Sequence, residues 1–389
     1  MQMRKIKEGV FWVGAVDWDR RLFDALVPLP DGTSYNAYLV TGSEKTVLID
    51  SVDPAFSAHL LTKLQDVARV DYIVANHAEQ DHSGTIPLVL EKYPLAKVVV
   101  TPKCKDMLID HLHIAPERFM TVADGETLSI GDKTLKFVHT PWVHWPETMS
   151  TFLVEDKILF SCDFFGAHLA TSDLYAVDEM RVYEAAKRYY AEIMMAFRSV
   201  IRKNIEKVEL LQPALIAPSH GPVYQRPQFI IDAYKDWLSD KPKNEVVIPY
   251  ISMHGSTAQL VERLVYRLAE KNLTVYQFNL ADSDIGKLAM SLVDAATIVL
   301  GTPTVYTAPH PKVSYAAMLA NALRPKARFV SVVGSYGWAT KAVEQLAGAI
   351  SGLKVEVIAP VICKGMPREA DLVAIDTLAA AIIEKHKTL

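Results

Sequence analysis

The sequence is poor in cysteine. Its 389 residues include only Cys104, Cys162 and Cys363, and no two of these form a Cys-x-x-Cys pair. This scarcity argues against a disulfide framework and against a built-in iron–sulfur or rubredoxin-type centre, because both need paired cysteines. We interpret the three thiols as small buried hydrophobic side chains.

Long apolar runs and an excess of basic charge are also missing. No stretch approaches the roughly eighteen apolar residues of a membrane span, and residues 1–9 contain no apolar signal core. The formal net charge is −4 and no basic tract stands out. Neither nucleic acid nor an anionic membrane surface is therefore an expected partner, and we expect a soluble, cytoplasmic protein.

The sequence does have enough apolar residues for two cores. Half of the residues are hydrophobic, and the chain is too long for one ordinary domain. A polar segment at 239–245 separates two patterns, so we place the domains at 1–243 and 244–389. In the first, short strands mix with helices, including a long helical stretch over 179–205, as in a sheet sandwich covered by helices. In the second, a five-stranded parallel α/β unit is predicted, with strands near 246–250, 274–278, 296–300, 328–333 and 353–359.

The densest cluster of metal-binding side chains follows the predicted strand 70–76. His77, Glu79, Asp81 and His82 lie within six residues of one another. In an extended segment, side chains two apart point the same way, so the first three can converge while His82 follows at the turn. A metal would relieve the cost of so many polar groups beside a core strand. The alternative is a hydrophilic loop whose ionisable groups face water.

Three more strand-like runs each lead to one candidate ligand. The runs 135–139, 157–160 and 215–217 are followed by His144, Asp163 and His220. Glycine or proline stands close to each of them. Seven such groups at strand ends suit a rigid sheet that holds a pair of metal ions at its rim, so the sequence predicts a two-metal site.

Three loops in the second half suit a flavin nucleotide. In a parallel α/β sheet the ligand lies outside the carboxyl ends of the strands. The loop 251–257 can wrap a phosphate with hydroxyl and amide groups, while 301–306 and 334–338 offer glycine-backed backbone and an aromatic side chain for a flat ring. Each loop alone could be an ordinary turn, and His254 could face either phosphate or solvent. The candidate cofactor-binding residues are Ser252, Met253, His254, Gly255, Ser256, Thr257, Pro303, Thr304, Val305, Tyr306, Ser335, Tyr336, Gly337 and Trp338.

These motifs resemble those of the flavodiiron proteins (A-type flavoproteins) over essentially the whole chain. They are His77-x-Glu79-x-Asp81-His82, His144-Trp-Pro-Glu147, Asp163-Phe-Phe-Gly166, Ser219-His220-Gly221, Met253-His-Gly-Ser-Thr257 and Thr302-Pro-Thr304. The resemblance implies an α/β fold with a metallo-β-lactamase-like αββα sandwich followed by a flavodoxin-like doubly wound parallel sheet. It also implies one FMN and two iron ions per chain. One iron would be held by His77, Glu79 and His144, the other by Asp81, His82 and His220, with Asp163 bridging the two.

The resemblance also implies an activity and partners. Family members reduce dioxygen to water, nitric oxide to nitrous oxide, or both. Two ferrous ions and a reduced FMN together hold the four electrons that dioxygen needs, and two nitric oxide molecules need two. The electrons are expected from a separate rubredoxin-like protein or from a reduced deazaflavin coenzyme. A head-to-tail homodimer, or a dimer of such dimers, is implied, with Trp145 and Trp338 either near its junction or simply packed.

Glu79 is the residue that separates iron from zinc. Zinc hydrolases of the same fold resemble this loop but carry His there, and a carboxylate is a harder, anionic ligand that favours iron. The alternatives are a zinc-dependent hydrolase fused to a flavodoxin-like module, and an electron carrier or sensor with a vestigial metal site. Asp24 stands next to Phe23, where relatives often carry His; it is a proton donor or an anchor, or else the pocket differs. We interpret His168 as a supporting or structural residue.

Overall fold

The computed structural model describes residues 2–389, which form two compact units divided between Leu238 and Ser239. Residues 239–243 group with the second unit, whereas the sequence predicts them in the first. The backbone N–H of Lys243 donates to the carbonyl of Asp294 in that second unit. None of the helices in residues 2–389 has the length and apolar character needed to cross a bilayer.

Two sheets form the centre of the first unit. In spatial order, the first sheet contains β1 (Arg4–Lys7), β2 (Val10–Trp12), β7 (Tyr38–Thr41), β8 (Thr46–Ile49), β9 (Tyr72–Val74), β10 (Lys97–Val100) and β11 (Phe119–Thr121). The second contains β12 (Thr127–Ser129), β13 (Thr134–His139), β14 (Met149–Leu153), β15 (Ile158–Cys162) and β16 (Leu215–Pro218). Two small ribbons pair β3 (Ala15–Asp17) with β6 (Thr33–Tyr35) and β4 (Leu22–Phe23) with β5 (Val27–Pro28).

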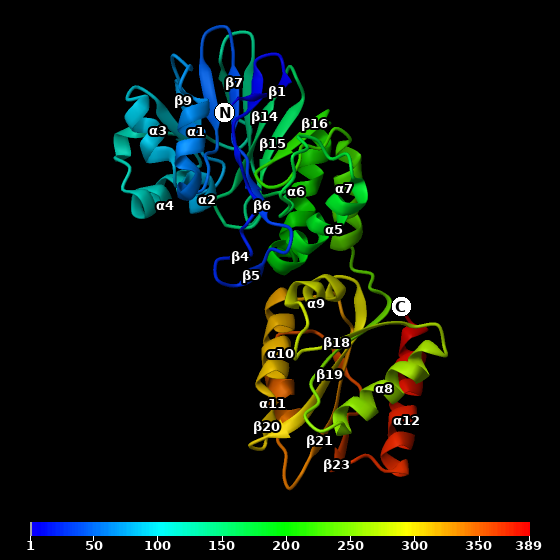
Figure 1. The fold of residues 1–389 in the computed structure, drawn as a ribbon. Helices are drawn as coiled ribbons and strands as arrows, with labels where there is room; N and C mark the ends of the chain where they lie inside the picture. Colours follow the sequence, from blue (N-terminus) through cyan, green and yellow to red (C-terminus); the bar gives the residue numbers. More distant parts are fainter. Residues whose placement is uncertain (1) are drawn as a thin grey trace. The chain divides into compact units, whose positions relative to one another are not determined.

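Helices cover the outer faces of both sheets (Figure 1). On the first sheet lie α1 (Ser57–Lys63), α3 (Ile86–Lys92) and α4 (Pro102–Leu112). On the second lie α5 (Glu179–Tyr189), α6 (Arg198–Leu211) and α7 (Pro227–Leu238). Shorter pieces are η1 (Pro54–Phe56), α2 (Gln80–Ser83) and η2 (Pro116–Arg118). The layers are those of an αββα sandwich, as predicted.

Alternating side chains bury both faces of the first sheet. Val47 and Ile49 of β8 point between the two sheets, where they share a core with Phe137 and Phe160 of the second sheet. Leu48, which stands between them in sequence, belongs instead to the core under α1, α3 and α4. Successive side chains of a strand point to opposite faces, so an uninterrupted apolar run marks a strand that is covered on both sides.

The predicted helical stretch over 179–205 is present, but it is not one regular α-helix. After α5 the chain forms one turn of π-helix, η3 (Tyr190–Met194), and a 3-10 turn, η4 (Met195–Phe197), before α6 begins. Tyr189, Tyr190 and Met194 are all buried across this break. A π-turn adds a residue to the helical register while the same face stays on the core, so apolar spacing does not reveal it.

A parallel sheet forms the second unit. Its strand order is β18 (Thr274–Asn279), β17 (Lys243–Tyr250), β19 (Ala295–Val305), β21 (Phe329–Tyr336) and β22 (Glu356–Val357), with β23 (Val361–Lys364) also on β21 and β20 (Ala308–Pro309) antiparallel on β19. Taken in chain order this is the flavodoxin-like arrangement 2-1-3-4-5. The single predicted strand 353–359 is wrong in its bounds, because two shorter strands share that edge.

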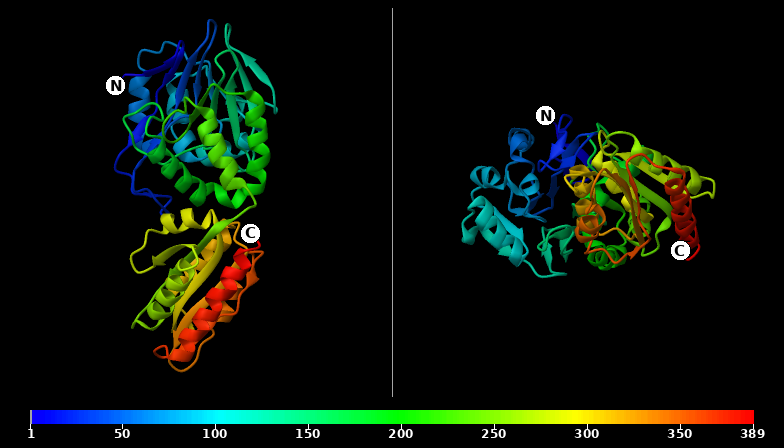
Figure 2. Two further views of the ribbon diagram at one scale, coloured as in Figure 1. Left: turned by 90° about the vertical axis from the view of Figure 1, so that its right-hand side faces the viewer. Right: turned by 90° about the horizontal axis from the view of Figure 1, so that it is seen from below.

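Helices lie on both faces of this parallel sheet. One face carries α8 (Ser256–Ala269) and α12 (Glu369–His386), and the other carries α9 (Ile285–Leu292), α10 (Pro311–Leu323) and α11 (Ala342–Ala349) (Figure 1). Figure 2 shows α12, in red, running along the strands. Because β17, β19 and β21 are parallel neighbours, the loops that follow them lie at the same edge of the sheet.

Candidate functional site

Four strand ends bring the predicted metal ligands together. The segment after β9 carries His77 and Glu79, and the loop between β13 and β14 carries His144. Strands β15 and β16 are parallel neighbours, so Asp163 and His220 follow them at one edge of the second sheet. All seven predicted ligands are shielded from solvent: Glu79 and His144 are half-buried, and His77, Asp81, His82, Asp163 and His220 are buried.

Asp81 and His82 are not in an extended segment, contrary to prediction. They lie on α2, a single helical turn that begins at Gln80. His77 and Glu79 precede this helix and belong to one group of converging side chains, whereas Asp81 and His82 belong to another. The change from extended to helical backbone at residue 80 therefore divides the cluster between two positions.

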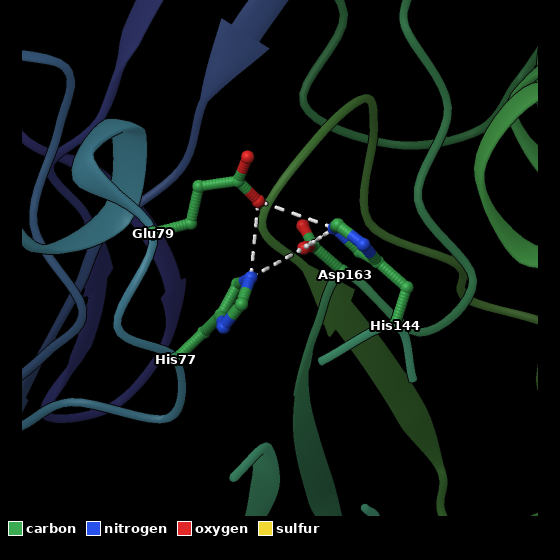
Figure 3. Close-up of side chains that lie close together, drawn as sticks. All are labelled: His77, Glu79, His144 and Asp163. Atoms are coloured by element: carbon green, nitrogen blue, oxygen red, sulfur yellow. Dashed lines mark hydrogen bonds and ion pairs between the residues drawn. The ribbon is translucent and has the colours of Figure 1, made fainter. Parts of the chain in front are cut away.

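The first group consists of His77, Glu79, His144 and Asp163, whose side chains point toward one another in Figure 3. Oε2 of Glu79 lies 3.1 Å from Nε2 of His77 and 3.1 Å from Nε2 of His144. Oδ2 of Asp163 lies 3.4 Å and 3.3 Å from the same two nitrogens. Atoms that each bind one ion at about 2.1 Å lie about 3.0–3.4 Å apart, so this spacing suits a single metal ion.

The second group consists of Asp81, His82 and His220, with Asp163 again at its edge. Oδ2 of Asp81 lies 3.1 Å from Nε2 of His82 and 3.2 Å from Nε2 of His220. Oδ1 of Asp163 lies 2.9 Å and 3.4 Å from these nitrogens. Asp163 thus presents one carboxylate oxygen to each group, as a ligand shared by two ions would.

Buried atoms of the second group lack hydrogen bonds. Within residues 2–389, five of these atoms have no hydrogen-bond partner: both carboxylate oxygens of Asp81, both ring nitrogens of His82, and Oδ1 of Asp163. These atoms are close together but are not aligned as donor and acceptor. A buried polar atom without a partner costs about 1–3 kcal/mol. A metal ion at the point that Asp81 Oδ2, His82 Nε2 and Asp163 Oδ1 face would satisfy these three atoms, so the residues present fit a metal pair.

Glu147 supports His77, a role that the sequence did not indicate. Nδ1 of His77 donates to Oε1 of Glu147 at 2.6 Å, and the backbone N–H of Ala78 donates to the same oxygen at 3.0 Å. Both side chains of the His–Glu pair are fully buried. A carboxylate on one ring nitrogen turns the other toward the metal and raises its basicity. The only signal in the sequence was that Glu147 belongs to the motif containing His144.

Asp50 and Asn76 hold the start of the metal-binding segment, and the sequence did not single out either residue. Asp50 accepts from the backbone N–H and the side-chain amide of Asn76 at 2.8 Å and 2.9 Å. The Thr151 hydroxyl of the second sheet donates to Asn76 Oδ1 at 2.7 Å. These bonds tie β8, the residue before His77 and β14 together, so both sheets fix the position of the first ligand.

Charges inside the cluster shift its pKa values in opposite directions. Burial alone would lower the pKa of His77, but its hydrogen bonds with Glu147 and Glu79 raise that pKa well above the ordinary value. Burial would likewise raise the pKa of Asp163, but the charge of His82 and the bond with His144 lower it well below the ordinary value. For His82, the charges of Asp81 and Asp163 outweigh burial and raise the pKa to about 9. The metal-free cluster therefore holds protons that a metal must displace.

Asp24 lies at the turn between β4 and β5. Asp24 and Ala25 have φ of 49° and 53°, and the N–H of Leu26 donates to the carbonyl of Phe23 at 2.9 Å. Two central residues with positive φ characterise the tight hairpin turn of type I′. Burial and then the charges of Glu79 and Asp81 raise the pKa of Asp24. This carboxyl group therefore lies within the electrostatic reach of both ligand groups.

His168 lies beside the second group without joining it. Its ring centroid is 4.6 Å from that of His220, and its Nδ1 is 2.9 Å from the Thr33 hydroxyl. Burial, followed by the charge of His220, lowers the pKa of His168 well below the ordinary value. A neutral imidazole in this place packs against a ligand. Trp145 has a similar relation to His77, with ring centroids 4.9 Å apart in an edge-on arrangement.

A cavity of about 450 Å³ opens at the carboxyl ends of β17, β19 and β21 in the second unit. It is lined by Met253, His254, Ser256, Pro303, Thr304, Ser335, Tyr336, Gly337, Trp338, Gly365 and Met366. Gly365 and Met366, which follow β23, are not among the predicted residues. Of the predicted ones, Ser252, Gly255, Thr257, Val305 and Tyr306 do not line it, and Tyr306 is 91% exposed.

The lining suits a flavin nucleotide. The hydroxyls of Ser256 and Ser335 are 2.8 Å apart beside the first turn of α8, where backbone N–H groups favour a phosphate. A Cβ added to Gly337 or Gly365 would meet no atom within 4 Å, so the backbone there borders open space. Tyr336 and Trp338 offer flat faces for a ring, and ligand cavities are typically about 300–1,000 Å³.

Comparisons with known proteins agree with this geometry. A family model described as "ODP family beta lactamase" matches residues 33–221. The nitric oxide reductase of Moorella thermoacetica is 35% identical over 379 residues, which are 94% of both chains. The structure of rubredoxin oxygen:oxidoreductase from Desulfovibrio gigas matches with a TM-score of 0.96 and 30% identity, covering 100% of this chain and 99% of that one. The flavodiiron protein from Giardia intestinalis matches with a TM-score of 0.91 and 29% identity, covering 99% and 98%.

The chain belongs to the flavodiiron protein family. This flavodiiron protein is accordingly an oxidoreductase with FMN and iron as its cofactors, and the predicted fold, a metallo-β-lactamase-like sandwich followed by a flavodoxin-like sheet, is confirmed. The zinc-hydrolase alternative is not favoured, because the relatives named above are oxidoreductases. An electron carrier with a vestigial metal site is not favoured either, since all seven predicted ligands converge.

Proposed function

We propose that this flavodiiron protein reduces dioxygen to water, nitric oxide to nitrous oxide, or both, at a non-haem di-iron site. The observation that carries the proposal is Asp163, which presents Oδ1 to one pair of histidines and Oδ2 to another. Residues 1–243 would form the iron-binding domain and residues 244–389 the FMN-binding domain. An external donor would supply electrons through FMN.

Each of the two groups of converging side chains would bind one iron. His77, Glu79 and His144 would hold one ion, Asp81, His82 and His220 the other, and Asp163 would bridge them. Each ion then has two imidazoles and its own carboxylate, a ligand type that leaves positions open for small gaseous molecules. When bound, the irons and FMN supply the electrons for the reduction. The lowered pKa values of Glu79 and Asp163 keep these two carboxylates ionised beside the irons, so they offset part of the charge of the oxidised pair.

In the second domain, we propose that the loop before α8 binds the FMN phosphate and that the aromatic side chains hold the ring. Ser252 shapes this loop, because its hydroxyl accepts from the N–H groups of Gly255 and Ala258 at 3.1 Å and 3.2 Å. Gly255 has φ of 90°, a conformation that side chains disfavour, and it leads directly into α8. Thr257, whose hydroxyl is 3.2 Å from that of Ser335, would keep the two loops together.

The partners follow from the same proposal. The donor would be a rubredoxin-like protein or a reduced deazaflavin coenzyme, and the assembly a head-to-tail homodimer or a dimer of such dimers. Trp338 at the cavity is 80% exposed, and an exposed aromatic side chain of this size is typical of a contact surface. The preference between the two gases would depend on residues near the irons such as Asp24. Sedimentation of the purified protein would measure its oligomeric state. Turnover with each candidate donor would identify the electron donor.

Metal and flavin analysis of the purified protein tests the proposal most directly. We expect about two irons and one FMN per chain, and oxidation of the anaerobically reduced protein when dioxygen or nitric oxide is added. Comparing turnover with the two gases and the two donors would assign the substrate. Two zinc ions and no flavin would contradict the proposal.

Replacing Glu147 by Gln should weaken iron binding at the first group by about 10–100-fold. The amide remains large enough to fill the site but is a weaker, neutral acceptor for Nδ1–H of His77. Anaerobic ferrous titration against a chelator would measure the change. Glu117→Gln, on the exposed turn η2, is the matched control. Equal iron affinity in the two variants would show that Glu147 only fills space.

Replacing Ser256 by Ala should weaken FMN binding by at least about tenfold, since a hydrogen bond to a charged group contributes about 1.5–3 kcal/mol. The hydroxyl lies at the first position of α8, where the phosphate is expected. Quenching of FMN fluorescence on titration with the flavin-free protein gives the affinity. Ser291→Ala in α9, whose hydroxyl donates to its own helix, is the control. An unchanged affinity would place the phosphate elsewhere.

A further inference from the structure

We propose that Met253 and Met366 form a site of oxidative modification, at which hydrogen peroxide released from the reduced flavin converts both thioethers to sulfoxides. The inference rests on the proposed FMN site. Both methionines line the cavity, and their exposed fractions are 53% and 52%. Neither residue has a part in the iron site, and nothing in the proposed reaction needs sulfur at either position.

The two sulfur-bearing residues come from opposite parts of the cavity wall. Met253 lies in the loop between β17 and α8, and Met366 lies in the loop between β23 and α12. Strands β19 and β21 separate these loops in the sheet, and Tyr336 and Trp338 line the cavity between them. A flavin ring held by those aromatic residues would therefore have a methionine on either side. Thioethers are soft, polarisable groups that pack against rings and are readily oxidised where solvent reaches them.

The chemistry needs only reactants that the proposed function already supplies. When a reduced flavin meets dioxygen directly, it gives up two electrons and two protons, and hydrogen peroxide forms. The sulfur of a methionine attacks one peroxide oxygen, the O–O bond breaks and an S–O bond forms. The sulfur is oxidised by two electrons, and the other oxygen leaves as water with both protons. No further reductant or oxidant is required.

The modification would act on flavin binding. A sulfoxide is polar and chiral, whereas the thioether it replaces is flexible and apolar. Two sulfoxides beside the ring would weaken the apolar contacts of the cavity, so FMN would be held less tightly after oxidation. Electron leakage to peroxide would thereby reduce the flavin content of the molecule that leaks. Sulfoxide reductases reverse this type of modification, so the effect would be regulatory rather than permanent.

Two exposed methionines outside the cavity distinguish oxidation by peroxide formed in the cavity from oxidation by peroxide in bulk solvent. Met180 on α5 is 84% exposed and Met318 on α10 is 61% exposed, and neither lines the cavity. Peroxide that arrives from bulk solvent should oxidise these two at least as fast as the cavity pair. Peroxide that forms inside the cavity should oxidise Met253 and Met366 first. The order of oxidation therefore reports where the peroxide forms.

The experiment uses the full-length protein loaded with iron and FMN. In one arm, the flavin is reduced anaerobically and reoxidised with air over several cycles, with catalase present to remove bulk peroxide. In the other, hydrogen peroxide is added to the oxidised protein. Peptide mass spectrometry then quantifies sulfoxide at all four positions. We expect several-fold more at Met253 and Met366 than at Met180 and Met318 in the first arm, and loss of this preference in the second. The same order in both arms would overturn the inference.

Paired substitutions test the consequence. Leucine has nearly the volume of methionine but cannot be oxidised. The fraction of FMN retained after cycling, relative to the same protein before cycling, should fall in the parent and hold constant in the double variant Met253→Leu/Met366→Leu. An equal fall in both proteins would overturn the inference. The flavin spectrum shows whether the cofactor proposal or only the present inference has failed. A protein that takes up no FMN overturns the cofactor proposal and this inference together, whereas FMN that binds and reoxidises without preferential sulfoxide formation overturns this inference alone.

Discussion

Replacing Asp163 by Asn should leave at most one iron per chain and lower the turnover of dioxygen or nitric oxide by at least about 100-fold. The estimate is a lower bound, because removing only a supporting partner of a ligand already costs up to that factor. Asp163 lies 2.9–3.4 Å from the ring nitrogens of four histidines and presents a different oxygen to each pair. An amide can offer one oxygen, and its NH₂ group cannot bind a cation. The substitution also removes one negative charge from between the two ions.

Iron content and steady-state turnover would be measured on the same preparation. Asp232→Asn on the exposed face of α7 is a suitable control, since its carboxylate accepts from Gln228 of the same helix and does not belong to either ligand group. The thermal midpoint of the metal-free protein would show whether the variant still folds. Two tightly bound irons in a folded Asp163→Asn protein would exclude Asp163 as the shared ligand.

Replacing Glu79 by His should exchange iron for zinc and abolish the reduction of both gases. Glu79 is the carboxylate of the first group, with Oε2 at 3.1 Å from both histidine nitrogens. Its hydrogen bonds with those histidines lower the pKa of Glu79 despite burial, so the group is a permanent anion there. A neutral imidazole lacks the charge that stabilises ferric iron, and three nitrogens with one oxygen suit zinc.

The metal would be identified after refolding or loading the variant with equal amounts of iron and zinc. The parent is expected to retain iron, and the variant is expected to retain zinc. Glu91→His, at an exposed position of α3, controls for the added histidine. An iron content unchanged by Glu79→His would refute the argument from ligand hardness, whatever the activity of the variant.

Local sequence patterns identified the metal ligands but did not assign each ligand to one of the two ions. Apolar runs ended at β9, β15 and β16, and each run led to a metal-binding side chain, as predicted. The extended geometry expected through Asp81 was wrong, because α2 begins one residue before it. A helical turn of four residues is too short to produce a periodic signal. The assignment of Glu79 to one group and Asp81 to the other therefore came from the resemblance and from the structure, not from the spacing.

The sequence analysis missed the residues that support the metal ligands. Glu147 and His77 are 70 positions apart in the chain, and Asp50 and Asn76 are 26 apart. A buried carboxylate that accepts from a ligand looks, in sequence, like any acidic residue near a turn. Its role depends on which other strand end lies beside it. Only the packing of the two sheets supplies that information.

The residues that line the FMN cavity were likewise predicted only in part from the sequence. Most of its wall comes from loops that follow β17, β19 and β21, and those loops were predicted from small and hydroxyl residues at strand ends. Met366 was missed because the last strand was placed at 353–359, before the true edge strand β23. The fifth strand is short and split, and a short split strand carries little alternation for a pattern to detect.

By itself, the sequence determined the chemistry of this protein: which side chains are available, that they stand at strand ends, and that a carboxylate at position 79 favours iron. These properties depend on neighbours a few residues away, where periodicity and turn preferences act. The tertiary structure decided the rest: that Asp163 faces both groups, that Glu147 holds His77, and that Met253 and Met366 line the same cavity. Those relations join residues that are distant in the chain. They exist only once the two sheets of the first unit have packed together and the parallel strands of the second unit have paired.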